Sequence, residues 1–332
     1  MERLKVAVVG VGYFGQFHAQ KYAGMSEVEL VGVVDIDPLR ARTVAKQCRT
    51  QFFSHHTEIL NRVQAVSIAV PTPLHHAIAR DFLLRGVDVL LEKPISKSLD
   101  EAEELIELAE PRGLILQVGH LERFNGPLLA LEGIIHDPLF IESNRLGPFL
   151  MRGTDIDIVL DLMIHDIEII LSWVDARIKR FHAVGIPVLT PHIDIANVRV
   201  EFDNDCTVNL TASRVSREKV RKIRLFQPNG YVSIDFLSQK VVFASKKEGS
   251  DKGAFPEILV EKIPVKKVDP LEMEIQSFLQ CVRNRKPPKV SGTDGKRALD
   301  LALQITRQIE ELLARKKAVN PPVNPHMNPV IG

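Results

Sequence analysis

The stretch KVAVVGVGYFG, from Lys5 to Gly15, decides the fold of this chain. An apolar β-strand pattern runs from Lys5 to Val9, and glycines then follow at positions 10, 12 and 15 with the spacing G-x-G-x-x-G. The first glycine permits a tight turn, the second lets the backbone approach a pyrophosphate, and the third allows close packing of the next helix. The stretch therefore predicts a strand, turn and helix that open a dinucleotide-binding α/β sheet, with the helix N-terminus facing an anion.

The second strand pattern delivers the acid that such a site needs. VELVGVV, from Val28 to Val34, places Asp35 twenty residues beyond Gly15, where a carboxylate can bind the adenosine ribose hydroxyls. Asp35 would repel the 2'-phosphate of NADP, and Ile36 follows it in place of a cationic or hydroxyl residue. The pattern predicts NAD as the cofactor. Arg40 lies near enough to keep NADP as an alternative.

Apolar runs recur through the first third of the chain and are separated by helical patterns. They span residues 5–9, 28–34, 65–70, 87–91 and 114–118. Continuous apolar strands are buried on both faces, which is typical of a parallel doubly wound sheet. We therefore expect an α/β protein whose residues 1–121 form a Rossmann dinucleotide-binding domain.

The pattern changes after Gly119 and predicts an α+β domain over residues 122–317. A helical segment at 156–174 precedes alternating strand patterns, and Asn204-Asp205 and Asn229-Gly230 signal hairpins. These features predict a large, mostly antiparallel open sheet. Helices are expected near 271–282 and 293–315, the last packing back on the first domain, followed by a Pro/Asn-rich tail at 318–332, either disordered or laid on a neighbouring subunit.

The bulk composition excludes several classes of function. The formal net charge is +1, and no apolar run approaches the roughly 20 residues of a membrane span, so neither nucleic-acid binding nor membrane insertion is expected. The three cysteines lie far apart without CxxC spacing, which favours a reduced cytoplasmic protein without a metal site.

A lysine follows the strand in VDVLLEKPIS, residues 87–96. Pro94 cannot continue the hydrogen bonding of a strand, so Glu92 and Lys93 should lie at its carboxyl end. Ligands bind at that edge of an open α/β sheet, so a functional Lys93 near the nicotinamide is favoured over a solvated edge charge.

A second pair of chemical residues lies on the helical segment 156–174. Asp161 and His165 are four residues apart, so their side chains share a helix face and the acid can orient the imidazole. Such a pair could be purely structural. Its combination with Lys93 favours catalysis, in which Lys93 or His165 takes the proton of a substrate alcohol, and the sequence leaves that choice open.

These motifs resemble those of the Gfo/Idh/MocA family of NAD(P)-dependent sugar oxidoreductases. The matching segments are GVGYFG, AVPTPLHHAIA, LLEKPIS, VGHLERFNGP, LDLMIHDIE and PPKVSGTDGKRALDLA. The resemblance implies that Lys93, Asp161 and His165 form the active site and that Thr72, Pro73 and His76 line the cofactor. IVL stands where the family has a glycine pair, and Met163 replaces a common glycine, which affects pocket shape more than chemistry.

The expected cofactor-binding residues are Gly10, Gly12, Tyr13, Phe14, Gly15, Asp35, Ile36, Val70, Pro71, Thr72, His76, Glu92, Lys93, His120 and Arg123. The expected substrate-binding residues are Lys93, Arg123, Asn125, Arg145, Arg152, Asp161, His165 and Arg214. The four arginines among them suit a diphosphate, although each could instead form a surface salt bridge.

Within the family, HLERFN and RGTDIDIVLDLMIHDIEIIL resemble the UDP-N-acetylglucosamine 3-dehydrogenases. That resemblance implies oxidation of the sugar 3-hydroxyl to a ketone ahead of an aminotransferase in lipid A or surface glycan biosynthesis. The alternatives are a dehydrogenase or reductase of a free sugar or inositol, and a non-catalytic NAD-binding regulator. The apolar second sheet also predicts a homodimer or homotetramer joined through these sheets.

Overall fold

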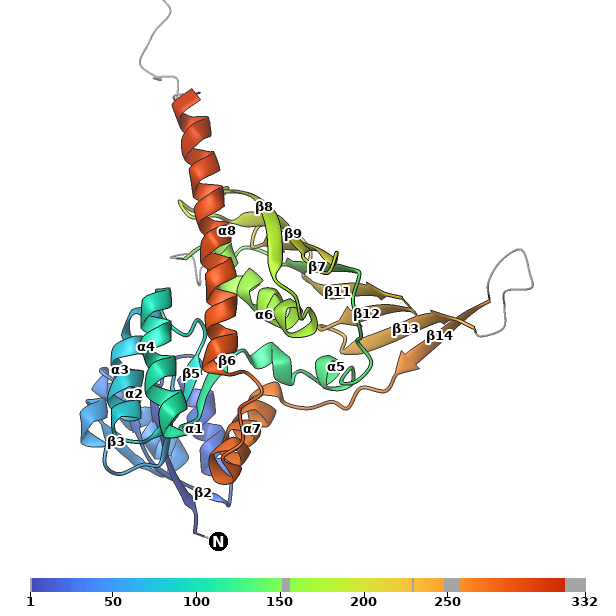
Figure 1. Ribbon diagram of the computed structural model, residues 1–332. Helices are drawn as coiled ribbons and strands as arrows, with labels where there is room; N and C mark the ends of the chain where they lie inside the picture. Colours follow the sequence, from blue (N-terminus) through green and yellow to red (C-terminus); the bar gives the residue numbers. More distant parts are fainter. Residues whose placement is uncertain (1, 151–155, 229, 248–256, 320–332) are drawn as a thin grey trace, which may run out of the picture.

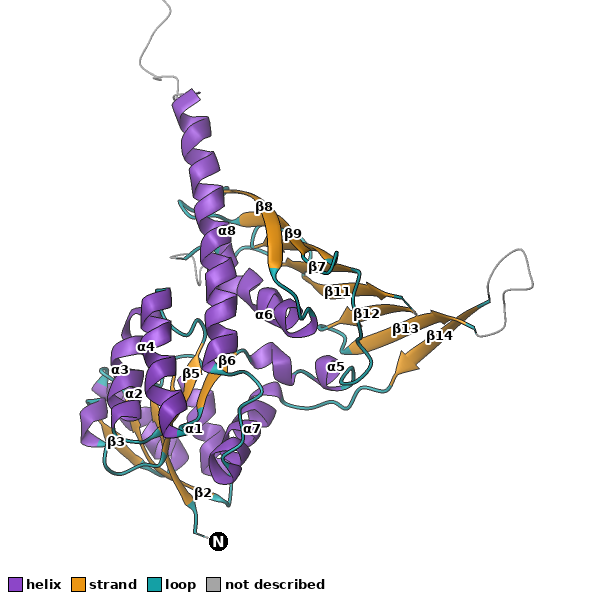
Figure 2. Ribbon diagram, viewed as in Figure 1, coloured by secondary structure: helices purple, strands orange, loops and turns teal. Residues whose placement is uncertain are grey.

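The structure is a computed structural model that describes residues 2–150, 156–228, 230–247 and 257–319. Two sheets organise the chain, one in the N-terminal third and the other in the C-terminal part (Figures 1 and 2). The predicted combination of a parallel α/β domain and an α+β domain is confirmed.

The first sheet has six parallel strands in the order β3-β2-β1-β4-β5-β6. Its strands are β1 (Leu4–Val9), β2 (Val28–Val34), β3 (Gln51–Phe53), β4 (Ala65–Ile68), β5 (Asp88–Glu92) and β6 (Leu116–Gly119). The five expected strands are present. The additional strand, β3, is three residues long and too short to give a periodic signal.

Helices cover both faces of this sheet, as its uniformly apolar strands require. They are α1 (Gly15–Gly24), α2 (Pro38–Cys48), α3 (His75–Leu84) and α4 (Leu99–Ala109). A fifth helix, α7 (Pro270–Asn284), returns to this domain from the far end of the sequence. Its Ile275 and Phe278 are fully buried in one core with Val6, Val8 and Tyr22. The domain therefore includes a segment that we expected in the second domain.

The second sheet has eight strands in the order β14-β13-β12-β11-β7-β10-β9-β8. They are β7 (Phe140–Leu146), β8 (Ile178–Ile186), β9 (Ile195–Phe202), β10 (Thr207–Ser213), β11 (Val220–Gln227), β12 (Gly230–Asp235), β13 (Lys240–Lys246) and β14 (Ile258–Ile263). All neighbours pair antiparallel except β7 and β10, which pair parallel. The expected hairpins β9-β10 and β11-β12 are present, although Asn229 itself lies outside the described residues.

One face of the second sheet packs against helices and the other is open. Short α5 (Gly126–Leu129), α6 (Ile164–Trp173) and α8 (Gly292–Val319) lie on the covered side (Figure 1). Along β9 the burial alternates with period two, which is typical of a sheet with a single covered face.

Helix α8 is shared between the two domains. Its Leu299 is buried in the core of the first sheet, and its Leu301 and Ile305 are buried in the core of the second. The expectation that this helix packs back on the first domain agrees with Leu299, and its other face belongs to the second domain.

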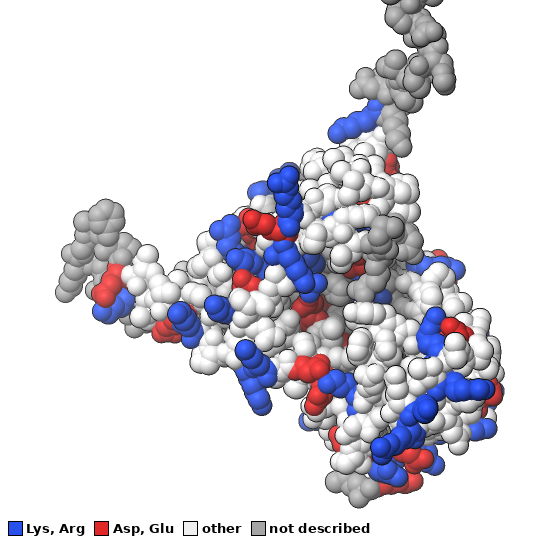
Figure 3. Space-filling model, turned by 180° about the vertical axis from the view of Figure 1, so that it is seen from behind, with Lys and Arg blue, Asp and Glu red and all other residues white. Residues whose placement is uncertain are grey.

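The face of the molecule seen in Figure 3 carries both signs of charge side by side, as a net charge of +1 predicts. Among the described helices, none combines the length and apolarity needed to cross a membrane.

Candidate active site

The glycine loop forms an open cradle between β1 and α1. Gly10 has φ of +82°, and a Cβ atom there would lie 2.6 Å from the backbone oxygen of Ala69. A Cβ on Gly15 would lie 1.7 Å from the backbone oxygen of Gly10, so helix α1 can begin there only with glycine. Nothing lies within 4 Å of the corresponding position at Gly12. The free space at Gly12 suits a diphosphate at the helix N-terminus.

Asp35 is held rigidly at the end of β2. Its carboxylate accepts hydrogen bonds of 2.9 Å from the backbone N–H groups of Val11 and Asp37. The Nη1 of Arg40 lies 3.3 Å from Oδ1 of Asp35, and Ile36 is 93% exposed beside it. The carboxylate is therefore positioned for ribose hydroxyls, and a cation stands next to it.

A cavity of about 750 Å³ runs from this acid to Lys93. Ten of the expected cofactor residues line it: Gly10, Gly12, Tyr13, Phe14, Asp35, Ile36, Val70, Pro71, Glu92 and Lys93. The expected residues Gly15, Thr72, His76, His120 and Arg123 are not in its lining. His76 is instead engaged by Glu104 at 2.8 Å. Ser54, His55 and His56 line the cavity without having been expected, because a loop after a three-residue strand gives no pattern.

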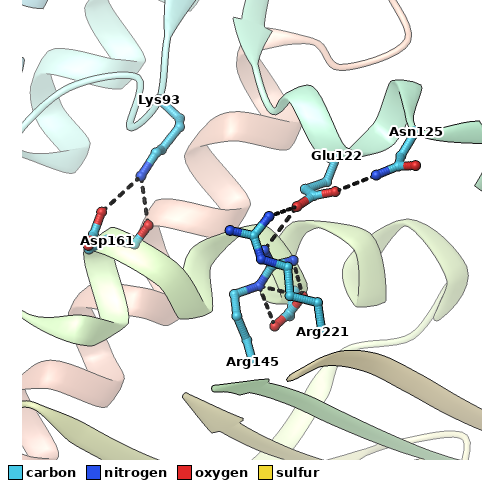
Figure 4. Close-up of polar contacts among 7 residues, drawn as sticks. Lys93, Glu122, Asn125, Arg145, Asp161 and Arg221 are labelled. Carbon is cyan, nitrogen blue, oxygen red and sulfur yellow. Dashed lines mark hydrogen bonds and ion pairs between the residues drawn. The ribbon is translucent and has the colours of Figure 1, made fainter. Parts of the chain in front are cut away.

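Lys93 lies at the carboxyl end of β5, as predicted, and points across to the second domain (Figure 4). Its Nζ donates a hydrogen bond of 2.7 Å to the backbone oxygen of Asp161 and lies 3.7 Å from that residue's carboxylate. Burial lowers the pKa of Lys93, while the negative charges of Asp161 and Glu92 act in the opposite direction. The amine is thus closer to neutrality than a surface lysine.

The helix that carries Asp161 and His165 is irregular. Residues Val159–Met163 form a π-helical turn before α6, a feature often found at functional sites. The expected hydrogen bond between Asp161 and His165 is absent from the described part of the chain. The carboxylate of Asp161 lies by Lys93, and Nδ1 of His165 has no hydrogen-bond partner among the described residues.

Two imidazoles lie close to Lys93, the buried ring of His120 and the partly buried ring of His165. The ring centroids of His120 and His165 are 6.3 Å apart in an edge-to-face arrangement. Burial, reinforced by the positive charge of Lys93, lowers the pKa of His120 to about 3 and that of His165 well below its usual range. Both rings are neutral at physiological pH, so each offers one N–H donor and one acceptor nitrogen.

The arginines expected for a diphosphate are committed to internal partners, so this expectation needs correction. Arg145 is buried and makes bidentate contacts of 2.7 to 3.2 Å with Asp166. It also lies 2.9 Å from Glu122, which in turn accepts a hydrogen bond of 3.0 Å from Asn125 (Figure 4). Burying a guanidinium requires such partners, and an arginine held this way is structural.

The remaining predicted arginines behave in the same way or cannot be assessed. Arg123 lies 2.6 Å from Glu168, a carboxyl whose pKa is raised by burial to about 7. Arg214 is buried and donates a hydrogen bond of 2.6 Å to the backbone oxygen of Ile156. Arg152 lies outside the described residues.

One arginine near the site was not among the substrate-binding residues expected from the sequence. Arg221 of β11 is 38% exposed and makes a long contact of 3.5 Å with Glu122 (Figure 4). Burial, followed by the neighbouring charge of Arg145, lowers its pKa. The signal was present in the strand alternation, because Arg221 shares the inward face with Ile223 and Leu225.

Known proteins are similar to this chain in sequence and fold over most of its length. Residues 4–120 match the model of an oxidoreductase family with an NAD-binding Rossmann fold. The chain is 37% identical to UDP-N-acetylglucosamine 3-dehydrogenase of Acidithiobacillus ferrooxidans, over 95% of this chain and 100% of that protein. A solved structure of that enzyme aligns with a TM-score of 0.88 at 35% identity, covering 94% of this chain and 100% of the other. An inositol 2-dehydrogenase of Rubrobacter xylanophilus is 30% identical over 56% of each chain.

Proposed function

Because this chain belongs to the Gfo/Idh/MocA family of NAD-binding Rossmann oxidoreductases, we propose that it oxidises the 3-hydroxyl of UDP-N-acetylglucosamine with NAD. The product is a 3-keto sugar nucleotide, which a subsequent aminotransferase can consume. The observation that carries the proposal is the similarity to a UDP-N-acetylglucosamine 3-dehydrogenase over 95% of this chain and all of that protein, together with Lys93 at one end of the cofactor cavity and His165 close enough to feel its charge.

The residues present fit a dinucleotide. The open space at Gly12 suits the diphosphate, and the buried carboxylate of Asp35 suits the adenosine ribose hydroxyls. When bound there, the nicotinamide would supply the acceptor for a hydride from the substrate carbon. NAD is favoured over NADP because Asp35 repels a 2'-phosphate, although Arg40 reduces that repulsion by pairing with the same carboxylate.

Lys93 is the residue we assign as the general base. Its pKa is lowered by burial, which makes the neutral amine easier to reach than in a surface lysine. His165 is the weaker candidate, because burial and the charge of Lys93 disfavour its protonated form. Asp161 holds the Lys93 amine through its backbone oxygen, which leaves a lone pair of the neutral nitrogen for the substrate proton.

His165 then serves to orient the reacting hydroxyl. A neutral imidazole can donate a hydrogen bond to the substrate oxygen or accept one from it, and its unpartnered Nδ1 has that capacity free. His120 borders the same space edge-on and restricts how the His165 ring can turn.

The diphosphate of the substrate needs a cation that is not already fully paired with acidic residues of the protein. Arg221 is the described arginine that best meets this need, because it is more than a third exposed and its contact with Glu122 is long. A charge-assisted bond from a guanidinium to a phosphate oxygen is stronger than that contact. Free sugars offer Arg221 no such partner.

The alternatives are oxidation or reduction of a free sugar or inositol, and a regulator without catalytic activity. The similarity to an inositol 2-dehydrogenase over about half of each chain supports the first of these. The presence of Lys93 and His165 in one site speaks against the second.

The test is isotopic. UDP-N-acetylglucosamine deuterated at C3 should transfer deuterium to the nicotinamide, detected by mass spectrometry of the reduced cofactor. A transaminase with glutamate removes the ketone and keeps an unfavourable equilibrium from hiding the reaction. Label transfer from inositol or from an unactivated sugar, with none from the sugar nucleotide, would replace this proposal with the first alternative. No transfer from any of them would favour the regulator.

A further inference from the structure

A buried group of three side chains lies behind the cofactor cavity. His18 comes from α1, Glu92 from the end of β5 and Glu274 from α7, and one ligand atom of each lies within 4.8 Å of the others. His18 is 1% exposed and Glu274 is 0% exposed, whereas Glu92 reaches the cavity wall beside Lys93. The group therefore connects the interior of the first domain with the site of the proposed chemistry.

The hydrogen bonds of this group are incomplete. Nε2 of His18 lies 3.1 Å from Oε1 of Glu92, but Nδ1 of His18 and both carboxyl oxygens of Glu274 have no partner among the described residues. An ionised carboxylate without a donor in a dry interior is costly, so Glu274 is neutral and carries a proton to donate. Within the group, the charged acceptor for that proton is the carboxylate of Glu92, and Nδ1 of His18 is a neutral one.

The surrounding elements supply few competing partners. The hydroxyl of Tyr22 on α1 is bonded to Ser67 at 2.8 Å. His75, at the start of α3, contacts two backbone oxygens at 2.8 and 2.9 Å. On β6, Gln117 donates to the backbone oxygen of Glu274 at 3.3 Å, and its own side-chain oxygen has no partner in the described chain. Lys93 is engaged with Asp161.

The position of Glu92 is fixed by the neighbouring strand. A Cβ atom at Gly119 of β6 would lie 3.1 Å from Cα of Glu92 and 3.2 Å from its Oε2. Glycine at this position leaves the space that the Glu92 side chain occupies. The carboxylate is thus packed between His18 and a strand backbone, where it has little freedom to turn away from Glu274.

We propose that Glu92 and Glu274 hold one proton between them, and that Glu274 is a positioning residue that keeps a single negative charge beside Lys93. Two carboxylates this close cannot both ionise cheaply, so the second charge is suppressed. Burial and the charge of Glu92 raise the pKa of Glu274 well above its usual range, in agreement with this arrangement. This positioning role of Glu274 rests on the proposed function only in that Lys93 is the proposed base.

Infrared spectroscopy of the cofactor-free protein tests the shared proton directly. At neutral pH the wild type should show a protonated carboxylic-acid carbonyl band that shifts in D₂O and is lost in Glu274→Gln. Glu272→Gln is the matched control, because Glu272 is a half-exposed acid on the same helix. Two other buried acids with a raised pKa, Asp88 and Glu168, are present in every variant and cancel in the difference spectra.

The coupling to Glu92 is tested by titrating that band. Glu92→Gln removes the neighbouring negative charge, so Glu274 should ionise at lower pH than in the wild type. If the pH of ionisation is unchanged in Glu92→Gln, the proton of Glu274 is bound elsewhere, for example by Gln117, and the proposal fails. It also fails if Glu274→Gln removes no band. Neither readout uses substrate, so these outcomes are separate from failure of the proposed function.

A stability comparison and a metal test complete the design. The pKa of Glu274 is higher in the folded protein than in the unfolded chain. Glu274 therefore lowers the free energy of unfolding only above its pKa in the unfolded chain, and by more as the pH rises. Glu274→Gln should therefore be more stable than the wild type at neutral pH, with the difference shrinking in acid. The three side chains are also metal-ligand types. Stabilisation of the wild type by Zn²⁺ that EDTA reverses and Glu274→Gln abolishes would make this a cation site and overturn the shared proton.

Discussion

The Nζ of Lys93 lies 2.7 Å from the backbone oxygen of Asp161 and 3.7 Å from its carboxylate. Asp161, in the second domain, therefore positions the amine of Lys93 and favours its protonated form. The π-helical turn at Val159–Met163 brings this backbone to the cleft. The geometry gives Asp161 a direct electrostatic effect on the proposed base.

Removing either proposed catalytic side chain should reduce turnover. Lys93→Ala and His165→Ala are each expected to lower kcat by about two orders of magnitude or more, because the first removes the base and the second the group that orients the hydroxyl. NADH affinity, measured by fluorescence titration, should change little, since Gly12 and Asp35 provide separate contacts. Lys97→Ala, at an exposed position on the same connection, is the control. Full activity in both variants would contradict the mechanism.

The pH dependence should report the effect of Asp161 on Lys93. A base works when deprotonated, so kcat should rise with pH through the pKa of Lys93. Asp161 raises that pKa, so Asp161→Asn should move the rise to lower pH. The measurement is kcat against pH, with the exposed Asp100→Asn as control. A shift to higher pH would exclude Lys93 as the titrating base.

Cofactor preference should depend on Asp35 and Arg40 together. The wild type is expected to bind NADH more tightly than NADPH, and Asp35→Ser should relax that preference by removing the repulsion and releasing Arg40 for a 2'-phosphate. The double variant Asp35→Ser/Arg40→Ala should lose the gain in NADPH affinity. The measurement is the dissociation constants of NADH and NADPH by fluorescence titration. Equal constants for the two cofactors in the wild type would refute the predicted preference for NADH.

Two arginines close together should behave differently. Arg221→Ala should raise KM for a UDP-sugar about tenfold or more while leaving stability nearly unchanged. Arg145→Ala should cost about 3–5 kcal/mol of unfolding free energy, because it leaves Asp166 buried without its cation. Urea unfolding and steady-state kinetics separate the two effects. A stable Arg145→Ala with a raised KM would return that residue to the substrate site.

The open face of the second sheet should be a subunit interface. Phe226 is 38% exposed there and lies with Phe140 and Tyr231 in a cluster of ring contacts at 4.9 to 5.8 Å. We expect a homodimer or homotetramer by light scattering at micromolar concentration, and smaller species for Phe226→Glu. Leu237→Glu, in the turn after β12, is a control of similar exposure. A monomeric wild type would contradict the prediction.

Much of the first domain could be predicted because its signals are local. The glycine spacing, the apolar strands and Asp35 each occupy a short segment whose physics fixes its place in a doubly wound sheet. The partners of the charged residues could not be predicted in this way. Arg145 and Asp166 are 21 positions apart, and only the packing of β7 against α6 brings them together. The sequence shows where the charged residues are, but not which of them become buried as pairs.

The π-helical turn escaped prediction for a related reason. The pattern from Ile156 to Val174 is apolar enough for any helix, and the extra residue in the turn changes the hydrogen-bond period without changing the composition. The interaction expected from a four-residue spacing was therefore replaced by the contact of Asp161 with Lys93.

Helix α8, which places Leu299 in one core and Ile305 in the other, ties the thermodynamics of the two domains together. Melting of either sheet exposes apolar surface that the same helix buries, so we expect the unfolding of one domain to destabilise the other. Lys93 and Asp161 come from different domains that this helix holds together. Their contact therefore does not carry the entropy cost of ordering two flexibly linked domains.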